Sequence, residues 1–205
     1  MVFPTQDIQI TLFDRSASAR ECRAVFFHRD MTVDFDPVTV AWKVIPLTSQ
    51  SVEHPFIYPA ASCVTARDSY GNHMPRLSAS PGELYHVKNS PSGHELWLKG
   101  PATSDREIQV ENDLDQGYID AFIFKADRPM AVKTSIAPQQ KAVFQIRSEL
   151  FVGLTSQAVA EGGSLPEMDV VQAILLTGLL SIRVVLDRSK AGAPGVISLE
   201  DEVRA

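Results

Sequence analysis

Alternation of apolar and polar residues is the feature that most constrains what this chain can fold into. In residues 7–13, the side chains of Ile8, Ile10 and Leu12 occur at every second position, so all three point to one face of an extended strand. Residues 39–45 are rich in β-branched and aromatic side chains, which strands favour. Short segments of this kind, separated by Pro, Gly, Asn and Asp, recur along the chain and predict an all-β fold.

The other candidate strands follow one another at short spacing. They are residues 23–28, 61–67, 83–88, 95–99, 106–111, 118–125, 130–135, 141–146, 150–155, 179–187 and 196–199. Turn-forming residues between the strands of residues 106–155 predict a β-meander of about five strands there. We therefore expect an antiparallel β-sandwich of about a dozen short strands.

One segment favours a helix instead. Ser164 and Glu167 have the spacing of a capping box, and Pro166 is tolerated in a first helical turn. Apolar residues then recur at helical spacing, and Gly178 offers a C-terminal stop. The sequence therefore predicts one short helix over residues 165–177, packed on the sandwich or across its end.

Length and composition indicate one domain. A chain of 205 residues with 44% hydrophobic and 21% charged residues resembles ordinary globular proteins and is long enough for one well-buried core. We expect a single β-sandwich domain over residues 1–205. No apolar run reaches the roughly 20 residues of a transmembrane segment. Residues 1–10 have neither a basic leader nor a signal-like apolar stretch, so we expect a cytoplasmic protein, or one exported without a classical signal peptide.

Charge and cysteine usage exclude several classes of function. The formal net charge of -6 and a pI of about 5.3 argue against a general nucleic-acid binder or a binder of anionic membranes. Cys22 and Cys63 both lie in apolar contexts, and we expect two reduced, buried thiols, with a single disulfide as the alternative. Neither belongs to a CxxC motif, which excludes a zinc ribbon and a thioredoxin-type site.

The histidines form no local metal motif. Five histidines are present, but none forms an HxH, HxxxH or HExxH pair. There is also no GxSxG motif and no Gly-rich phosphate loop. We therefore expect no metal, no cofactor and no catalytic residue, and the sequence favours a non-enzymatic protein. The open alternative is a cupin-like metal-dependent enzyme with ligands drawn from His54, His73, His86 and His94.

Residues 67–73 form the densest polar and aromatic cluster of the chain. Asp and Asn side chains beside an aromatic ring are suited to a small polar ligand such as a sugar, and a second aromatic residue would supply a stacking face. The competing interpretation is a loop whose Asp and Asn cap their own turn. The candidate ligand-binding residues are Tyr58, Asp68, Tyr70, Asn72, His73 and Trp97.

Three stretches are similar to a family of uncharacterised all-β proteins of bacteria and fungi. They are Asp-Ser-Tyr-Gly-Asn at 68–72, Glu-Ile-Gln-Val-Glu-Asn-Asp at 107–113 and Ala-Pro-Gln-Gln-Lys-Ala-Val-Phe at 137–144. The similarity covers about residues 40–155. This family has no assigned activity and no known catalytic residues, so the resemblance implies one architectural unit and transfers no site.

The leading hypothesis is a non-enzymatic β-sandwich protein that acts by binding or by homo-oligomeric self-assembly. Two observations support it. The chain has many strands, whose exposed edges can pair with another chain, and it has no catalytic motif. The alternative is a lectin-like or membrane-lipid recognition module, whose loops at 46–60 and 68–82 would hold a glycan or a lipid headgroup. The partners expected are therefore a second copy of the chain, a glycan or a lipid headgroup, and not nucleic acid.

Overall fold

The structure is a computed structural model that describes residues 6–15, 22–32, 38–47, 52–168, 170–187 and 195–205. Within these residues it contains sixteen strands and no helix, so the fold is all-β. No helix able to cross a membrane is found in the same part of the chain. Backbone contacts divide the chain into unit 1 (residues 1–28, 40–60 and 148–205) and unit 2 (residues 29–39 and 61–147). The expectation of one domain over residues 1–205 stays a prediction, and each unit is described by itself.

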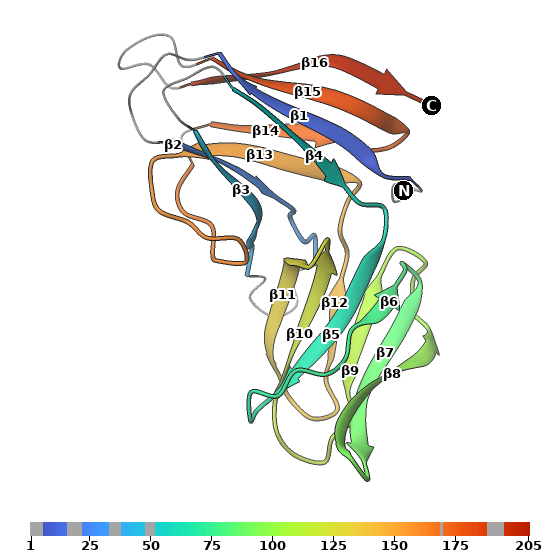
Figure 1. Ribbon diagram of the computed structural model, residues 1–205. Coiled ribbons are helices and arrows are strands. Elements are labelled where there is room, and N and C mark those ends of the chain that lie inside the picture. Colours follow the sequence, from blue (N-terminus) through green and yellow to red (C-terminus); the bar gives the residue numbers. More distant parts are fainter. Residues whose placement is uncertain (1–5, 16–21, 33–37, 48–51, 169, 188–194) are drawn as a thin grey trace. The chain divides into compact units, whose positions relative to one another are not determined.

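Unit 1 consists of two four-stranded sheets (Figure 1). One has the order β16-β15-β1-β4 and contains β1 (Ile8–Asp14), β4 (Glu53–Tyr58), β15 (Leu179–Asp187) and β16 (Val196–Arg204). The other has the order β14-β13-β2-β3 and contains β2 (Cys22–Phe27), β3 (Ala41–Leu47), β13 (Glu149–Thr155) and β14 (Val170–Leu175). Because β1 runs parallel to β15, the first sheet is mixed, and the expectation of a purely antiparallel fold is wrong here.

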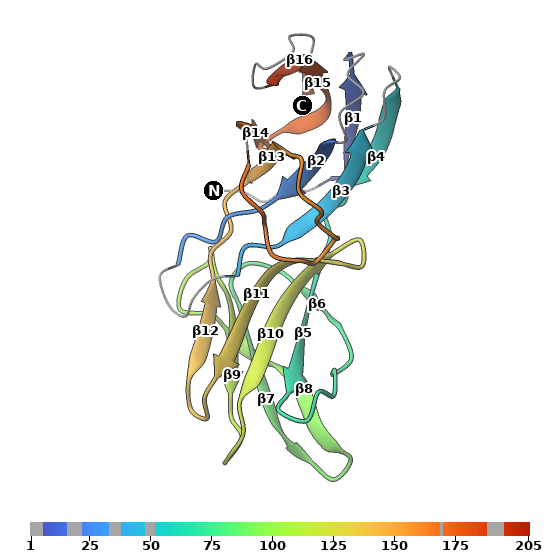
Figure 2. The same ribbon diagram turned by 90° about the vertical axis from the view of Figure 1, so that its left-hand side faces the viewer.

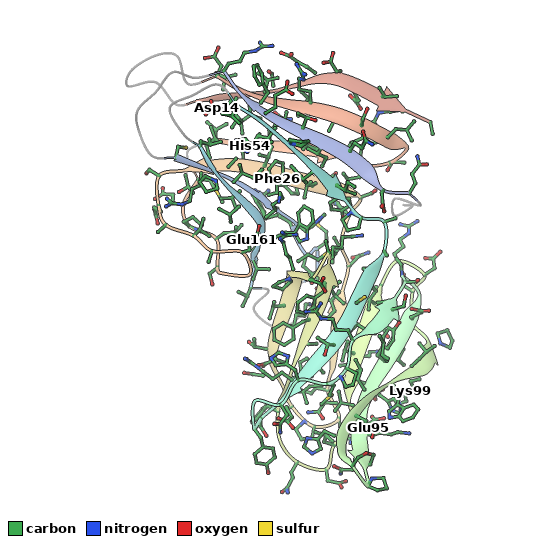
Figure 3. The ribbon with its side chains drawn as sticks, in the orientation of Figure 1. Asp14, Phe26, His54, Glu95, Lys99 and Glu161 are labelled. Atoms are coloured by element: carbon green, nitrogen blue, oxygen red, sulfur yellow. The ribbon has the colours of Figure 1, made fainter. Side chains whose placement is uncertain are left out.

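The two sheets of unit 1 bury their facing sides against each other. Ile8, Ile10 and Leu12 of β1 are fully buried, which confirms the alternation predicted for this strand. The ring of Phe26 on β2 meets the ring of Phe56 on β4 edge to face, with centroids 5.0 Å apart (Figure 3). An aromatic pair in this geometry adds about 0.5–1.5 kcal/mol beyond the burial of its surface.

The helix predicted over residues 165–177 is wrong. Val170–Leu175 forms β14, which pairs antiparallel with β13. Within β14 the side chain of Ile174 is fully buried whereas the neighbouring Leu175 is 52% exposed, an alternation of period two. The β-branched residues of this segment favour a strand, Gln172 and Ala173 favour a helix, and the ladder to β13 decided between the two. Residue 169 lies outside the described residues.

The chain before β14 is an irregular connection with a turn at residues 161–162 rather than a capped helix. Ser164 forms an isolated bridge to Val40, so it does not cap a helix. A Cβ on Gly153 would come within 2.8 Å of the Met168 sulfur, which shows how closely the connection lies on β13. A side chain at position 153 would therefore displace the Met168 side chain.

Unit 2 also consists of two four-stranded sheets (Figure 2). One has the order β11-β10-β5-β6 and contains β5 (Ser62–Asp68), β6 (Leu77–Ala79), β10 (Ile119–Lys125) and β11 (Arg128–Ile136). The other has the order β12-β9-β7-β8 and contains β7 (Glu83–Ser90), β8 (Gly93–Pro101), β9 (Ile108–Asn112) and β12 (Lys141–Phe144). This second sheet is mixed as well, because β7 runs parallel to β9.

The meander predicted for residues 106–155 is wrong, because β9 and β10 belong to different sheets. Among the strands of residues 106–155, only β10 and β11 form a hairpin. They are joined by a tight turn in which Ala126 and Asp127 both have positive φ, 46° and 61°. Such a two-residue turn matches the twist of antiparallel strands. After β9, by contrast, Asn112 ties the crossing loop down: its Nδ2 donates to the carbonyls of Gly117 and Ile136, both at 2.9 Å.

Strand β4 lies in a stretch, residues 46–60, that the sequence indicated to be an irregular loop. Pro55 sits in the middle of β4, opposite Thr11 of β1. Proline cannot donate to a ladder, but β4 is the outer strand of its sheet, so one of its sides needs no partner. Residues 48–51 lie outside the described residues.

A buried ion pair lies in unit 2. The Lys133 side chain on β11 is fully buried, and its Nζ lies 3.5 Å from Oδ2 of Asp30 and donates to Oγ1 of Thr32 at 2.5 Å. The other carboxylate oxygen of Asp30 accepts from the backbone N–H groups of Thr32 and Gln145, each at 3.1 Å. The network therefore ties three separate segments of unit 2 together through one carboxylate.

We expect Asp30→Ala to lower the free energy of unfolding by about 3–5 kcal/mol, because it removes a buried carboxylate that lies beside the buried Lys133 ammonium. Urea denaturation at pH 7 measures this. The matched control is Asp105→Ala, which removes a carboxylate whose side chain is 93% exposed, and it should change stability by less than about 0.5 kcal/mol. Equal, small effects of both substitutions would show that the buried pair does not contribute as described.

Candidate functional site

A polar pocket of about 350 Å³ opens in unit 2. Its walls come from the loop after β5, from the two strands beside the β7–β8 turn and from the loop between β9 and β10. The volume lies at the lower end of the range of small-molecule sites. The lining residues are Ser69, Tyr70, Asn89, His94, Asp115, Gln116 and Gly117.

Asp68, the last residue of β5, organises one wall of the pocket. Its Oδ1 accepts the backbone N–H groups of Tyr70 and Asn72, both at 2.9 Å. Its Oδ2 accepts from Nδ2 of Asn72 at 3.2 Å and from Nδ1 of His94 at 3.0 Å. Gly71 has a φ of 88° and allows the chain to turn back over the carboxylate. One carboxylate therefore holds both the loop that presents Tyr70 and the ring of His94.

The electrostatics of the turn keep Asp68 ionised. Burial alone would raise the pKa of Asp68, but hydrogen bonds from Asn72, His94 and the Tyr70 backbone outweigh burial and lower this pKa below its ordinary value. The residue is only 7% exposed and all four of its contacts are internal. Asp68 and Asn72 therefore position the wall of the pocket from behind.

Tyr70 and His94 stand beside each other in the pocket. Their ring centroids are 6.3 Å apart and their planes differ by 30°. Asp68 engages Nδ1 of His94, whereas Nε2 of this ring forms no hydrogen bond with the described residues and is available to a ligand. Tyr70 is 78% exposed, so a ligand can reach its ring without any rearrangement of the core.

Several polar side chains of the pocket have hydrogen-bonding groups that are available to a ligand. In the part of the chain that the structure describes, the side chains of Ser69, Asn89, Asp115 and Gln116 form no hydrogen bond or ion pair. Together they offer hydroxyl, amide and carboxylate groups, which can donate to and accept from a bound molecule. Gly117 closes the loop with a φ of 92°, and a Cβ there would lie 3.1 Å from the Ser69 hydroxyl.

Tyr58 does not belong to this pocket, because it is a core residue of unit 1. It is 1% exposed, and its hydroxyl lies 3.2 Å from Nε2 of His28. Its ring packs against Trp42, with centroids 5.2 Å apart. Burial raises the pKa of Tyr58 far above its ordinary value. A buried tyrosine of this kind offers no stacking face to a ligand.

His73 and Trp97 also lie away from the pocket. The His73 ring contacts Phe122 of β10, with centroids 5.6 Å apart. On β8, Trp97 follows His94 by three residues, so the two side chains point to opposite faces of the sheet. Of the six residues predicted to bind a ligand, the structure places Tyr70 in the wall of the pocket and Asp68 and Asn72 behind it.

The sequence-based prediction missed Asn89, His94, Asp115 and Gln116. These residues come from two further connections, and strand pairing brings them beside Tyr70: Asn89 lies directly opposite His94 in the β7–β8 hairpin. A usable signal existed, because polar residues cluster in the turns at 69–72, 89–94 and 113–117. Which of these turns share one end of the unit depends on sheet topology.

No metal centre emerges from the described residues. Among them, no group of three or more His, Cys, Asp or Glu side chains could hold a metal ion. His86 lies opposite Trp97 and therefore on the other face of the sheet from His94, and His54 belongs to unit 1. Cys22 and Cys63 form no disulfide, and both are half-buried rather than buried as expected.

Comparison of the chain with protein-family models, with the curated proteins and with the solved structures finds no match. The resemblance to an uncharacterised all-β family therefore stays a prediction. What the protein does has to be argued from the geometry of its own residues.

We expect Asp68→Asn to lower the free energy of unfolding by about 1–3 kcal/mol at pH 7, because an amide cannot accept all four hydrogen bonds. The folded pKa of Asp68 is lowered, so its ion contributes stability above the unfolded pKa of about 4. This contribution is lost as the pH falls through the lowered folded pKa. Denaturation of both proteins between pH 7 and pH 3 should show the difference shrinking below about pH 4. A difference that stays constant with pH would contradict the assignment.

Proposed function

We propose that this chain is a non-enzymatic β-sandwich protein that acts by binding, and that its pocket in unit 2 takes a small, hydroxyl-rich molecule such as a mono- or disaccharide. The observation that carries the proposal is the convergence of uncommitted polar side chains beside an exposed tyrosine ring. The face-to-face sheets of each unit support the sandwich architecture.

The pocket chemistry is suited to sugar hydroxyls. A hydroxyl both donates and accepts, and the amides of Asn89 and Gln116 do the same, while Asp115 accepts. The ring of Tyr70 can lie against the C–H face of a pyranose. Because Asp68 already holds the backbone of Tyr70, little of the loop has to be ordered on binding.

The charges of the pocket favour a glycan over a lipid headgroup. Neither Lys nor Arg is among the lining residues, whereas Asp115 adds a carboxylate. A phosphate would meet this negative charge without a cation to compensate it, and a neutral sugar would not.

We expect Tyr70→Ala to weaken binding of the preferred mono- or disaccharide by about tenfold, the loss that one good aromatic contact would explain. A glycan array identifies the ligand and calorimetry measures its affinity. Because Tyr70 is exposed, the thermal stability should be unchanged. The matched control is Trp97→Ala, which removes an exposed aromatic ring from the opposite face of β8 and should leave binding intact. An array without any bound small glycan would refute the proposal.

Self-assembly is the second candidate function, and the outer strands of unit 1 favour it. β14 and β16 are the outer strands of their sheets and contact each other. Val171 and Leu175 on β14 are 39% and 52% exposed, and Val203 on β16 is 49% exposed. An outer strand with exposed apolar side chains is a template for pairing with another chain. A second copy of this protein is the partner that we propose for this edge.

We expect Leu175→Lys to shift the protein from an oligomer to a monomer, because a charge on an exposed outer strand blocks pairing between strands. Light scattering across a wide concentration range measures the molar mass. The matched control is Ile57→Lys, which places the same charge on β4, the opposite outer strand of the first sheet, where the native residue is 58% exposed. A wild-type protein that stays monomeric at all concentrations would exclude self-assembly.

A further inference from the structure

We propose a second binding site in unit 2, on the outer face of the sheet β12-β9-β7-β8, that takes the interior of a linear, uncharged polysaccharide chain. Its centre is Trp97, which is 48% exposed. Strand register places Trp97 opposite His86 of β7, and His86 opposite Glu111 of β9. These three side chains form a row across three neighbouring strands, and the row is called the platform below.

The ring of Trp97 is held in place before any ligand arrives. Its Nε1 donates to Oε2 of Glu95 at 3.1 Å, and the ammonium of Lys88 lies 5.1 Å from the ring centroid. Glu95 itself accepts from the Ser92 hydroxyl at 2.5 Å. Lys88 covers part of the ring, and nearly half of Trp97 stays exposed, so the remaining indole surface is open to a ligand. A fixed ring loses little freedom when a ligand stacks on it.

The charged neighbours of the platform are paired with one another. The Nζ of Lys99 lies 2.7 Å from Oε2 of Glu111 and 3.0 Å from Oδ2 of Asp113, and Nδ1 of His86 lies 2.7 Å from the same Asp113 oxygen. Figure 3 labels Lys99 and Glu95, which both lie on β8. The hydrogen bonds to Glu111 and Asp113 raise the pKa of Lys99. Burial alone would raise the pKa of Asp113, but hydrogen bonds with His86 and Lys99 outweigh burial and lower this pKa. Lys99 and Asp113 are therefore both charged at neutral pH.

This arrangement selects an uncharged occupant. The ammonium of Lys99 lies between two carboxylates and that of Lys88 lies over the indole, so both cations nearest to Trp97 are already engaged, while Lys141 at the far end of the row donates to the Thr103 hydroxyl. The remaining lone pairs of the carboxylates and the polar edge of His86 can bind hydroxyl groups. An indole face beside hydroxyl-binding groups matches the two chemical faces of a pyranose ring.

The geometry also distinguishes an extended chain from a small sugar. Neighbouring strands lie about 4.8 Å apart, so the row from Trp97 to Glu111 spans about 10 Å, which suits consecutive rings of a linear chain. The platform lies on an open sheet face, whereas the pocket beside Tyr70 is enclosed by loops at the other side of β8. The two sites are independent, and the platform does not rest on the function proposed for the pocket.

Affinity electrophoresis of the full-length protein tests the platform. Native gels containing glucomannan, hydroxyethylcellulose or a soluble β-1,3-glucan should retard the wild-type protein, and a gel with the anionic polymer alginate should not. Trp97→Ala should weaken the interaction by about tenfold or more, while Trp97→Phe, which keeps an aromatic face, should retain part of it. Leu98→Ala should be retarded like the wild type, because Leu98 is 56% exposed and lies on the opposite face of β8 from Trp97.

Three results would overturn the proposal. They are no retardation by any of the neutral polysaccharides, equal retardation of the wild type and Trp97→Ala, or stronger retardation by alginate than by the neutral polymers. Thermal unfolding of each variant shows that it is folded, and Trp97→Phe provides the measurement if the alanine variant is not. Binding of a disaccharide, measured separately on Tyr70→Ala, reports on the pocket, so a failure of one site is distinguishable from a failure of the other.

Discussion

Alternation between a buried and a more exposed face, as in β1 and β10, is the constraint that governs both the fold and the proposed sites. In β8, the inward side of the strand carries His94 towards Asp68, while the outward side carries Glu95 and Trp97 to the sheet surface. The core therefore uses half of the side chains in such a strand. The other half is available for chemistry at no loss of packing, which explains how one hairpin can contribute to two separate surfaces.

Much of the fold could be predicted from the sequence because alternation is a local property. The alternation of Ile8, Ile10 and Leu12 is enough to predict β1, and most other strands were predicted in the same way. The failures concern pairing between distant segments. Residues 170–175 suit a helix or a strand equally well by composition, and only the ladder to β13 decides the outcome. Similarly, Pro55 argues against a strand unless that strand is known to be an outer one. The two parallel pairs leave no local trace at all.

The same distinction applies to the pocket. Asp68 and Tyr70 could be recognised because the turn that joins them is a local structure, closed by hydrogen bonds over a few residues. His94 and Asn89 could not, since their place beside Tyr70 follows from how β5, β7 and β8 come together in unit 2. Tyr58 fails for the opposite reason: an aromatic residue in a proline-bounded stretch looks accessible, whereas it is buried against Trp42.

The buried Lys133–Asp30 pair has a consequence for strand alignment. The β10–β11 hairpin contains two irregularities in its register, so backbone pairing alone defines the alignment of β11 poorly. A slip of one residue would turn Lys133 to the opposite face of the sheet, and the carboxylate of Asp30 would lose this cation. The ion pair thus specifies one register of β11. It disfavours shifted registers that a purely apolar interior would tolerate.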